Sequence, residues 1–141
     1  MNSSIICLSN CNELATFFLT KEFKKYINIS NKNELKGKLA NAWYDLLKDY
    51  WKSNKQAGNL REIQSLIGKK YKKFDSDEQQ VANEFIVLFL ELLGEDLNEI
   101  KNKKYLEFKE QQHQETDEES DKRFWDLHLS RNNSIITNLF C

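Results

Sequence analysis

The stretch NELKGKLANAWYDLLKDYW, residues 33–51, carries the clearest helical pattern in the sequence. Its apolar side chains recur at steps of three and four residues, which places them on one face of an α-helix. These side chains are Leu35, Leu39, Trp43, Leu46, Leu47, Tyr50 and Trp51. Because charged and polar residues fill most of the positions between them, the stretch predicts a principal core helix with one buried face.

Two shorter helices are predicted before this segment. Residues 3–9 predict a helix that buries Ile5, Ile6 and Leu8, and Asn12 is of a type that favours the N-cap of a following helix. The inward side chains expected in that second helix are Leu14, Phe17, Phe18 and Leu19. A loop around residues 28–33 then leads into the core helix.

Two further helices are predicted after the core helix. The first, with Leu60 and Ile63 on its apolar face, is expected to end at Gly68, since Gly commonly follows the last helical residue. The second is expected to open at Ser76, with acidic residues in its first turn, and to end at Gly94. Its apolar face consists of Val81, Phe85, Leu88, Phe89, Leu92 and Leu93.

The last part of the chain divides into a polar stretch and a helix pair. Residues from about 109 to 121 include few apolar side chains, so we expect a mobile loop there that includes Gln111 to Asp121. Order is expected to return at Phe124. The segment FWDLHLSRNNSIITNLFC, residues 124–141, then predicts two helices broken at Asn132-Asn133.

Composition agrees with a single helical domain. The chain has 141 residues, of which 40% are hydrophobic and 12% aromatic, enough for one real core. It has no Pro and only four Gly, so few positions interrupt a helix. The predicted fold class is therefore all-α.

Charge and hydropathy exclude several classes of partner. The 21 basic residues are balanced by 22 acidic ones, whereas a nucleic-acid surface usually shows a basic excess. The longest apolar run, Phe85 to Leu93, is interrupted by Glu91, and the first 20 residues lack the basic start of a signal peptide. Three Cys, an odd number, suit a reducing compartment. We expect no nucleic acid, no membrane, and a cytoplasmic or nuclear location.

The run Lys69, Lys70, Lys72 and Lys73 has two interpretations. It could form a phosphate-binding patch, or it could be solvated charge that the dipole favours after a helix C-terminus. The balanced net charge favours the second interpretation.

The cysteines and histidines offer neither a clear metal site nor a clear nucleophile. Cys7 and Cys11 lie one helical turn apart and could join His113 and His128 as zinc ligands, but the spacing is not that of a zinc finger. Cys7 lies between two apolar residues and is interpreted as a packed side chain. A catalytic thiol would gain most at the N-terminus of the first helix. We predict no metal, no cofactor and no catalytic residue within the chain.

Polar residues gather near the start of the apolar stretch DEQQVANEFIVLFLELL, residues 77–93. They are Gln79, Gln80, Asn83 and Glu84. Periodicity alone favours their being the solvent-facing side of that helix.

Three stretches, in order, resemble the ubiquitin-specific protease (ubiquitin carboxyl-terminal hydrolase) family. MNSSIICLSN, residues 1–10, is similar to the continuation of the family's Cys box, and QQVANEF, residues 79–85, resembles its Gln-Gln-Asp-Ala-Gln-Glu-Phe motif. WDLHLSRNNSIITNLF, residues 125–140, resembles the end of the family's first subdomain. The resemblance implies that residues 1–141 are a partial catalytic domain: the helical thumb of a papain-like cysteine protease fold, without fingers and palm.

The resemblance also implies a chemistry. Members of the family hydrolyse the bond after the C-terminal Gly of ubiquitin through a thioester, so the implied partners are ubiquitin or ubiquitinated proteins. By the same resemblance the nucleophilic Cys falls two residues before Met1, and the general-base His falls in the palm. We therefore expect the 141 residues to be inactive alone.

Two residues are implied to bind the basic tail of ubiquitin. Gln79 matches the first Gln of the motif and Glu84 matches its second acid. Position 81 is Val where the family has Asp, so one charge-assisted contact, worth about 1.5–3 kcal/mol when well formed, is expected to be missing.

Two alternatives remain open. The chain could be a natural module that binds ubiquitin without cleaving it. It could also be a general helical interaction module that uses the apolar surface around Ile135 to Phe140.

Overall fold

The computed structural model describes residues 2–30, 35–52, 60–75, 81–101, 103 and 115–140. Within these ranges all regular secondary structure is helical, which confirms the all-α prediction. The elements are α1 (Asn2–Ser9), α2 (Asn12–Leu19), the 3-10 helix η1 (Glu22–Lys25), α3 (Lys38–Lys52), α4 (Leu60–Lys70), the 3-10 helix η2 (Lys72–Phe74), α5 (Ala82–Asp96), α6 (Asp117–Leu129) and α7 (Ile135–Phe140).

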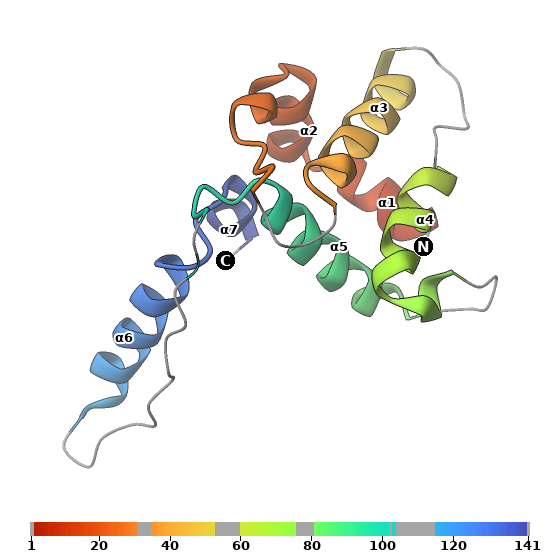
Figure 1. Ribbon diagram of the computed structural model, residues 1–141. Coiled ribbons are helices and arrows are strands. Elements are labelled where there is room, and N and C mark those ends of the chain that lie inside the picture. Colours follow the sequence, from red (N-terminus) through yellow and green to blue (C-terminus); the bar gives the residue numbers. More distant parts are fainter. Residues whose placement is uncertain are drawn as a thin grey trace.

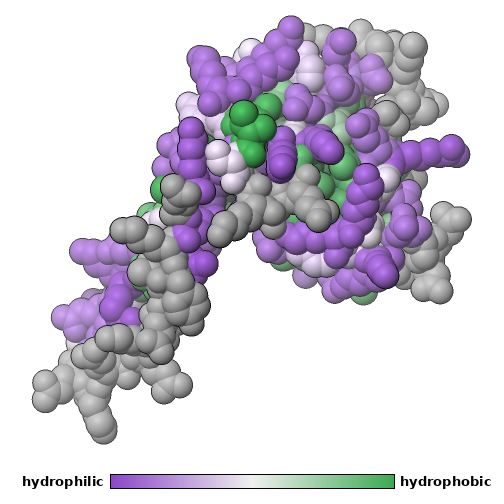
Figure 2. All heavy atoms as spheres, in the orientation of Figure 1, coloured by the Kyte–Doolittle hydropathy of each residue, from purple (hydrophilic) through white to green (hydrophobic). Residues whose placement is uncertain are grey.

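Helix α5 lies at the centre of the arrangement (Figure 1). It packs against α1, α3 and α7, while α3 also packs against α2 and α4. Helix α6 projects away from the other helices (Figure 1). In the view of Figure 2, hydrophilic side chains cover most of the described surface, and a smaller group of apolar side chains lies near its middle.

The buried face of α3 follows the predicted pattern over most of its length. Leu39, Trp43 and Leu47 are fully buried, and the Trp43 ring meets the Phe89 ring of α5 edge to face, with centroids 5.1 Å apart. The prediction is wrong at the end of the helix, where Tyr50 and Trp51 are exposed. Trp51 lies over the end of α1 instead, and its indole N–H donates to the carbonyl of Ser9 at 3.0 Å.

Helix α1 buries a narrower face than predicted. Ile5 and Leu8 are buried, but Ile6 is 50% exposed and Cys7 is exposed, so the predicted burial of these two residues is wrong. A helix of eight residues packed on one side can bury only the positions on that side. Helix α2 starts at Asn12 itself, with Cys11 at the N-cap, so the predicted cap is displaced by one residue.

Two glycines expected to end helices lie inside them. Gly68 is buried within α4, and a Cβ there would come within 2.9 Å of the Asp75 Cβ. Gly94 lies within α5, beside Ile136 of α7 and beside Ser134, which directly precedes α7. Gly68 needs a small side chain because Asp75 approaches closely, whereas a Cβ at Gly94 would make ordinary contacts at 3.5 Å or more. A pattern of single residues does not distinguish a Gly inside a helix from a C-cap.

The predicted mobile loop is wrong at its C-terminal end. Helix α6 begins at Asp117 with a complete capping box, in which Thr116 caps the helix and the Glu119 carboxylate accepts from the Thr116 N–H at 3.0 Å. Residues 109–114 lie outside the described residues, as does Ser76, the predicted start of α5, which begins at Ala82. None of the apolar side chains of α6 is fully buried; these are Phe124, Trp125, Leu127 and Leu129.

No helix in the described ranges combines the length and apolar character needed to cross a lipid bilayer.

Candidate functional site at the start of α5

Residues 81–85, the described part of the motif QQVANEF, lie at the N-cap and in the first turn of α5. Glu84 lies in this turn with its side chain about half exposed, and Val81 occupies the N-cap and is 67% exposed. Gln79, the other residue expected to bind the tail of ubiquitin, lies outside the described residues. The structure thus presents a carboxylate at the surface where the dipole of α5 favours negative charge.

The Glu84 carboxylate forms an ion pair with Lys73 of η2. Phe74 follows Lys73 and is buried, and its ring packs edge to face on Phe85 of α5, with centroids 5.8 Å apart. Lys73 and Glu84 each precede one ring of this pair by one residue. Packing of the two rings therefore brings the two charged side chains together.

Helix α5 also affects the pKa of Tyr71, the residue that precedes η2. Burial, and then the Glu91 carboxylate of α5, raise the pKa of Tyr71, whereas the nearby Lys73 ammonium lowers it less. The phenol is therefore neutral at physiological pH, and the charges near this turn are those of the lysines and of the α5 carboxylates.

The three stretches of interest in the sequence converge on α5. The Ser4 hydroxyl of α1 donates to the carbonyl of Ala82 at 3.4 Å, which joins the first stretch to the second. Helix α7, in the third stretch, packs against α5 as well. Segments that are 78 residues apart in the sequence, Ser4 and Ala82, thus meet at the end of α5 that carries Glu84.

Neither of the described thiols has an imidazole beside it. Cys7 is exposed, and the Cys11 Sγ lies 3.9 Å from a Glu13 carboxylate oxygen. The His128 ring of α6 stacks on Trp125 instead. In the described part of the chain neither thiol is hydrogen-bonded to an imidazole, and no three His, Cys, Asp or Glu side chains are grouped to hold a metal ion. His113 and Cys141 lie outside the described residues.

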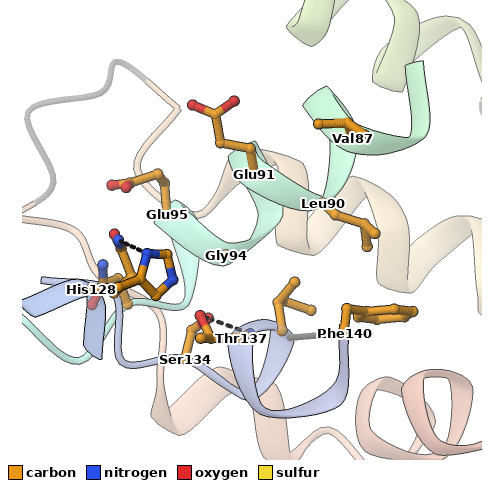
Figure 3. A pocket seen from close by; sticks show the side chains of 12 residues that line it. Val87, Leu90, Glu91, Gly94, Glu95, His128, Ser134, Thr137 and Phe140 are labelled. Atoms are coloured by element: carbon orange, nitrogen blue, oxygen red, sulfur yellow. Dashed lines mark hydrogen bonds between the residues drawn. The ribbon is translucent and has the colours of Figure 1, made fainter. Parts of the chain in front are cut away.

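A second feature is a pocket of about 390 Å³ between α5 and α7 (Figure 3). Its apolar walls are formed by Val87 and Leu90 of α5 and by Phe140 of α7. The carboxylates of Glu91 and Glu95 also project from α5 (Figure 3). The pocket includes part of the apolar surface expected around Ile135 to Phe140. Glu95 is ion-paired with Lys103, so Glu91 is the exposed carboxylate of this rim.

The sequence model of the family described as ubiquitin carboxyl-terminal hydrolase matches residues 1–141. The chain belongs to the ubiquitin carboxyl-terminal hydrolase family. The family is thus established over the whole chain, including the three stretches that meet at α5.

Individual members of the ubiquitin carboxyl-terminal hydrolase family align along nearly the whole chain. Ubiquitin carboxyl-terminal hydrolase 4 of Bos taurus is 34% identical over 140 residues, and ubiquitin carboxyl-terminal hydrolase 15 of Rattus norvegicus is 32% identical over 144 residues. Each alignment covers 99% of this chain but only 14% and 15% of the two relatives. The chain therefore corresponds to a small part of these longer hydrolases.

Sequence reasoning missed the partner of Glu84. The lysine run was interpreted as solvated charge, whereas Lys73, its last member, contacts α5. The one signal that could have indicated this contact is the position of Lys73 and Glu84 directly before two aromatic residues. The pairing of those aromatic rings is a tertiary contact that sequence periodicity does not reveal.

Replacing Val81 with Asp should stabilise the chain. Val81 has the extended backbone of an N-cap, with φ −68° and ψ 122°, but its side chain accepts no capping hydrogen bond. An Asp carboxylate can accept from the free N–H groups of the first turn, a gain of about 1 kcal/mol, which raises the thermal midpoint by about 4 °C. Thermal unfolding followed by circular dichroism measures this shift.

The control for this variant is Val87→Asp, at an exposed position in the middle of α5. Asp has low helix propensity in a helix interior, so the control should lower the midpoint slightly. Equal midpoints for the two variants would mean that position 81 does not cap α5.

Proposed function

We propose that these 141 residues form the helical, ubiquitin-tail-binding part of the catalytic domain of a deubiquitinating cysteine protease. The observation that carries the proposal is the surface carboxylate of Glu84, placed where α1 meets the first turn of α5 and already in contact with a cationic side chain. In the parent reaction, hydrolysis would follow the C-terminal Gly of ubiquitin through a thioester. Glu84, with Gln79, would hold the basic tail that precedes this Gly.

The described thiols do not supply the nucleophile in this proposal. A thiolate nucleophile is favoured by an imidazole base or by a positively charged environment, and Cys11 instead lies beside the Glu13 carboxylate. We propose that the nucleophile precedes α1 and that the base lies outside residues 1–141. The 141 residues alone would then bind ubiquitin without cleaving it.

Titration of the isotope-labelled chain with ubiquitin tests the proposal. Amide NMR shifts are expected at Ala82 to Phe85, and Glu84→Gln should weaken binding about fivefold, since a half-exposed charge pair contributes about 1 kcal/mol. In the same samples a fluorogenic amide of the ubiquitin C-terminus should remain intact. Release of the fluorophore would contradict the assignment of the nucleophile.

The control is Glu118→Gln, which removes an exposed acid from the first turn of α6. This change should leave ubiquitin binding as it is in the unmodified chain. Equal affinities for the unmodified chain and for Glu84→Gln would remove Glu84 from the site and count against the proposed function.

The pocket between α5 and α7 favours a second candidate function, that of a helical protein-interaction module. Its apolar walls and the exposed Glu91 fit a segment in which an apolar side chain stands next to Lys or Arg. The same titration separates the two functions. Ubiquitin-induced shifts confined to Val87 and Phe140, and unaffected by Glu84→Gln, would favour the interaction module.

A further inference from the structure

Lys73 forms an ion pair with Glu84, the carboxylate that the proposed function assigns to the ubiquitin tail. The ion pair joins two side chains that are both partly exposed, 43% for Lys73 and 45% for Glu84. The carboxylate therefore faces solvent, but a cation from the same chain already neutralises it. A basic ligand that approaches Glu84 meets this cation first.

We propose that Lys73 is an intramolecular competitor that lowers the affinity of the Glu84 site for basic ligands. The proposal rests on the proposed function and concerns the same site. An incoming Arg or Lys must either displace the Lys73 ammonium or bind beside it and accept repulsion between like charges. Either route weakens binding, so Lys73 restricts the site to ligands with further contacts elsewhere.

The backbone around Lys73 is held in place, so the competitor remains near the site. Phe74 is buried against Phe85, and the N–H of Asp75 donates to the carbonyl of Lys72 at 3.0 Å. Gly68 allows Asp75 to approach α4 closely. These contacts fix the start of the Lys73 side chain beside α5 and keep its effective concentration at Glu84 high.

The Lys73 side chain itself can move away from Glu84. It has four flexible carbons and is partly exposed, and its ammonium lies 5.2 Å from the centroid of the Phe74 ring. The ammonium already has this contact while it is paired with Glu84, so one favourable contact remains when a ligand displaces it from the carboxylate. Lys73 therefore reduces the affinity of the site without closing it, as expected of an exposed ion pair, which changes binding by about two- to fivefold.

The test measures the affinity of fluorescently labelled ubiquitin for the 141-residue chain and its variants by anisotropy. Lys73→Gln is expected to bind about two- to fivefold more tightly than the unmodified chain. The gain should shrink at high salt, which screens exposed charges. Lys73→Arg keeps the cation and should bind like the unmodified chain.

Two further variants separate the ion pair from a general charge effect. Lys72→Gln removes the neighbouring exposed charge but not the ion pair, and it should raise affinity less than Lys73→Gln. Lys73→Gln combined with Glu84→Gln should gain nothing over Glu84→Gln alone. Far-UV circular dichroism confirms that each variant keeps its helices.

The outcomes distinguish this inference from the proposed function. If Glu84→Gln weakens binding but Lys73→Gln does not strengthen it, the competitor role is wrong and the tail site stands. Equal gains from Lys72→Gln and Lys73→Gln would also overturn the competitor role. If Glu84→Gln has no effect, the tail site itself is wrong.

Discussion

Replacing Trp43 with Ala should lower the free energy of unfolding by about 4 kcal/mol, the largest effect we expect from a single core substitution. Trp43 is fully buried in α3, and its ring meets the Phe89 ring of α5 at an interplanar angle of 66°. Truncation removes this contact between the two main helices and leaves a cavity that the rigid helices cannot fill completely. Urea unfolding followed by far-UV circular dichroism measures the loss.

Trp51→Ala is the matched control because it truncates the same residue type on the same helix. Trp51 is 48% exposed and makes one hydrogen bond to the Ser9 carbonyl, so its truncation should cost only about 1 kcal/mol. Similar losses for the two variants would mean that α3 does not bury the Trp43 face.

Trp43→Phe adds a finer comparison. The Trp43 indole N–H is buried and has no hydrogen-bond partner in the part of the chain that the structure describes. Phe keeps an aromatic ring against Phe89 and removes this unsatisfied donor, so the loss should stay well below that of the Ala variant.

Sequence periodicity predicted the elements whose burial follows from one continuous pattern. The α3 face is of this kind, because Leu39, Trp43 and Leu47 alternate with polar residues over several turns and all three are buried. Periodicity failed in α1, where Ile6 is as apolar as Ile5 but lies on the exposed side. In so short a helix the packing partner, here α5, decides which side is buried, and that partner is distant in sequence.

Residues that commonly mark helix ends predicted those ends correctly only where a whole capping motif was present. Thr116 and Glu119 form a capping box that fixes the start of α6, and this signal was present in a stretch interpreted from composition as a loop. Gly68 was assigned to a helix end, but its role is to admit Asp75. A single Gly carries no information about which distant segment will approach it.

The candidate site was predicted in part. Periodicity predicted that Glu84 lies on the solvent-facing side of its helix, and the resemblance to the family motif implied a basic partner. Its partner within the chain, Lys73, could not be predicted, because the two side chains meet only after Phe74 packs on Phe85. A tertiary contact of this kind has no local signature.

Replacing Asp96 with Ala should cost about 3 kcal/mol, the second largest effect that we expect. Asp96 ends α5 and is fully buried, and its Oδ2 accepts from the N–H groups of Leu39 at 3.0 Å and Ala40 at 3.2 Å. These N–H groups belong to the first turn of α3, so α5 caps its neighbour through a carboxylate. Ala leaves both donors buried without an acceptor, and unfolding in urea measures the cost.

Asp96→Asn is the control that keeps an acceptor and removes the charge. One Asn oxygen can still accept from the first turn of α3, so the loss at neutral pH should be about 1 kcal/mol or less. An Asn variant as unstable as the Ala variant would show that the charge, rather than the hydrogen bonds, makes Asp96 necessary.

The pH dependence of the Asp96→Asn comparison gives the sharpest test of the electrostatics. Burial raises the pKa of Asp96 above its ordinary value of 3.8, and the Glu95 carboxylate adds to this, although the backbone N–H groups of Gly37, Ala40 and Leu39 lower it in part. The folded chain therefore holds this proton more tightly than the unfolded chain, so this pH-dependent part of the stabilisation is fully present below about pH 3.8 and is lost as the pH rises through the folded pKa, whereas the hydrogen bonds from Leu39 and Ala40 remain. Asn does not titrate, so the unmodified chain should lose stability relative to Asp96→Asn as the pH rises from 3.8 toward neutrality. The opposite trend would mean that the hydrogen bonds from α3 outweigh burial and hold the carboxylate in its charged form.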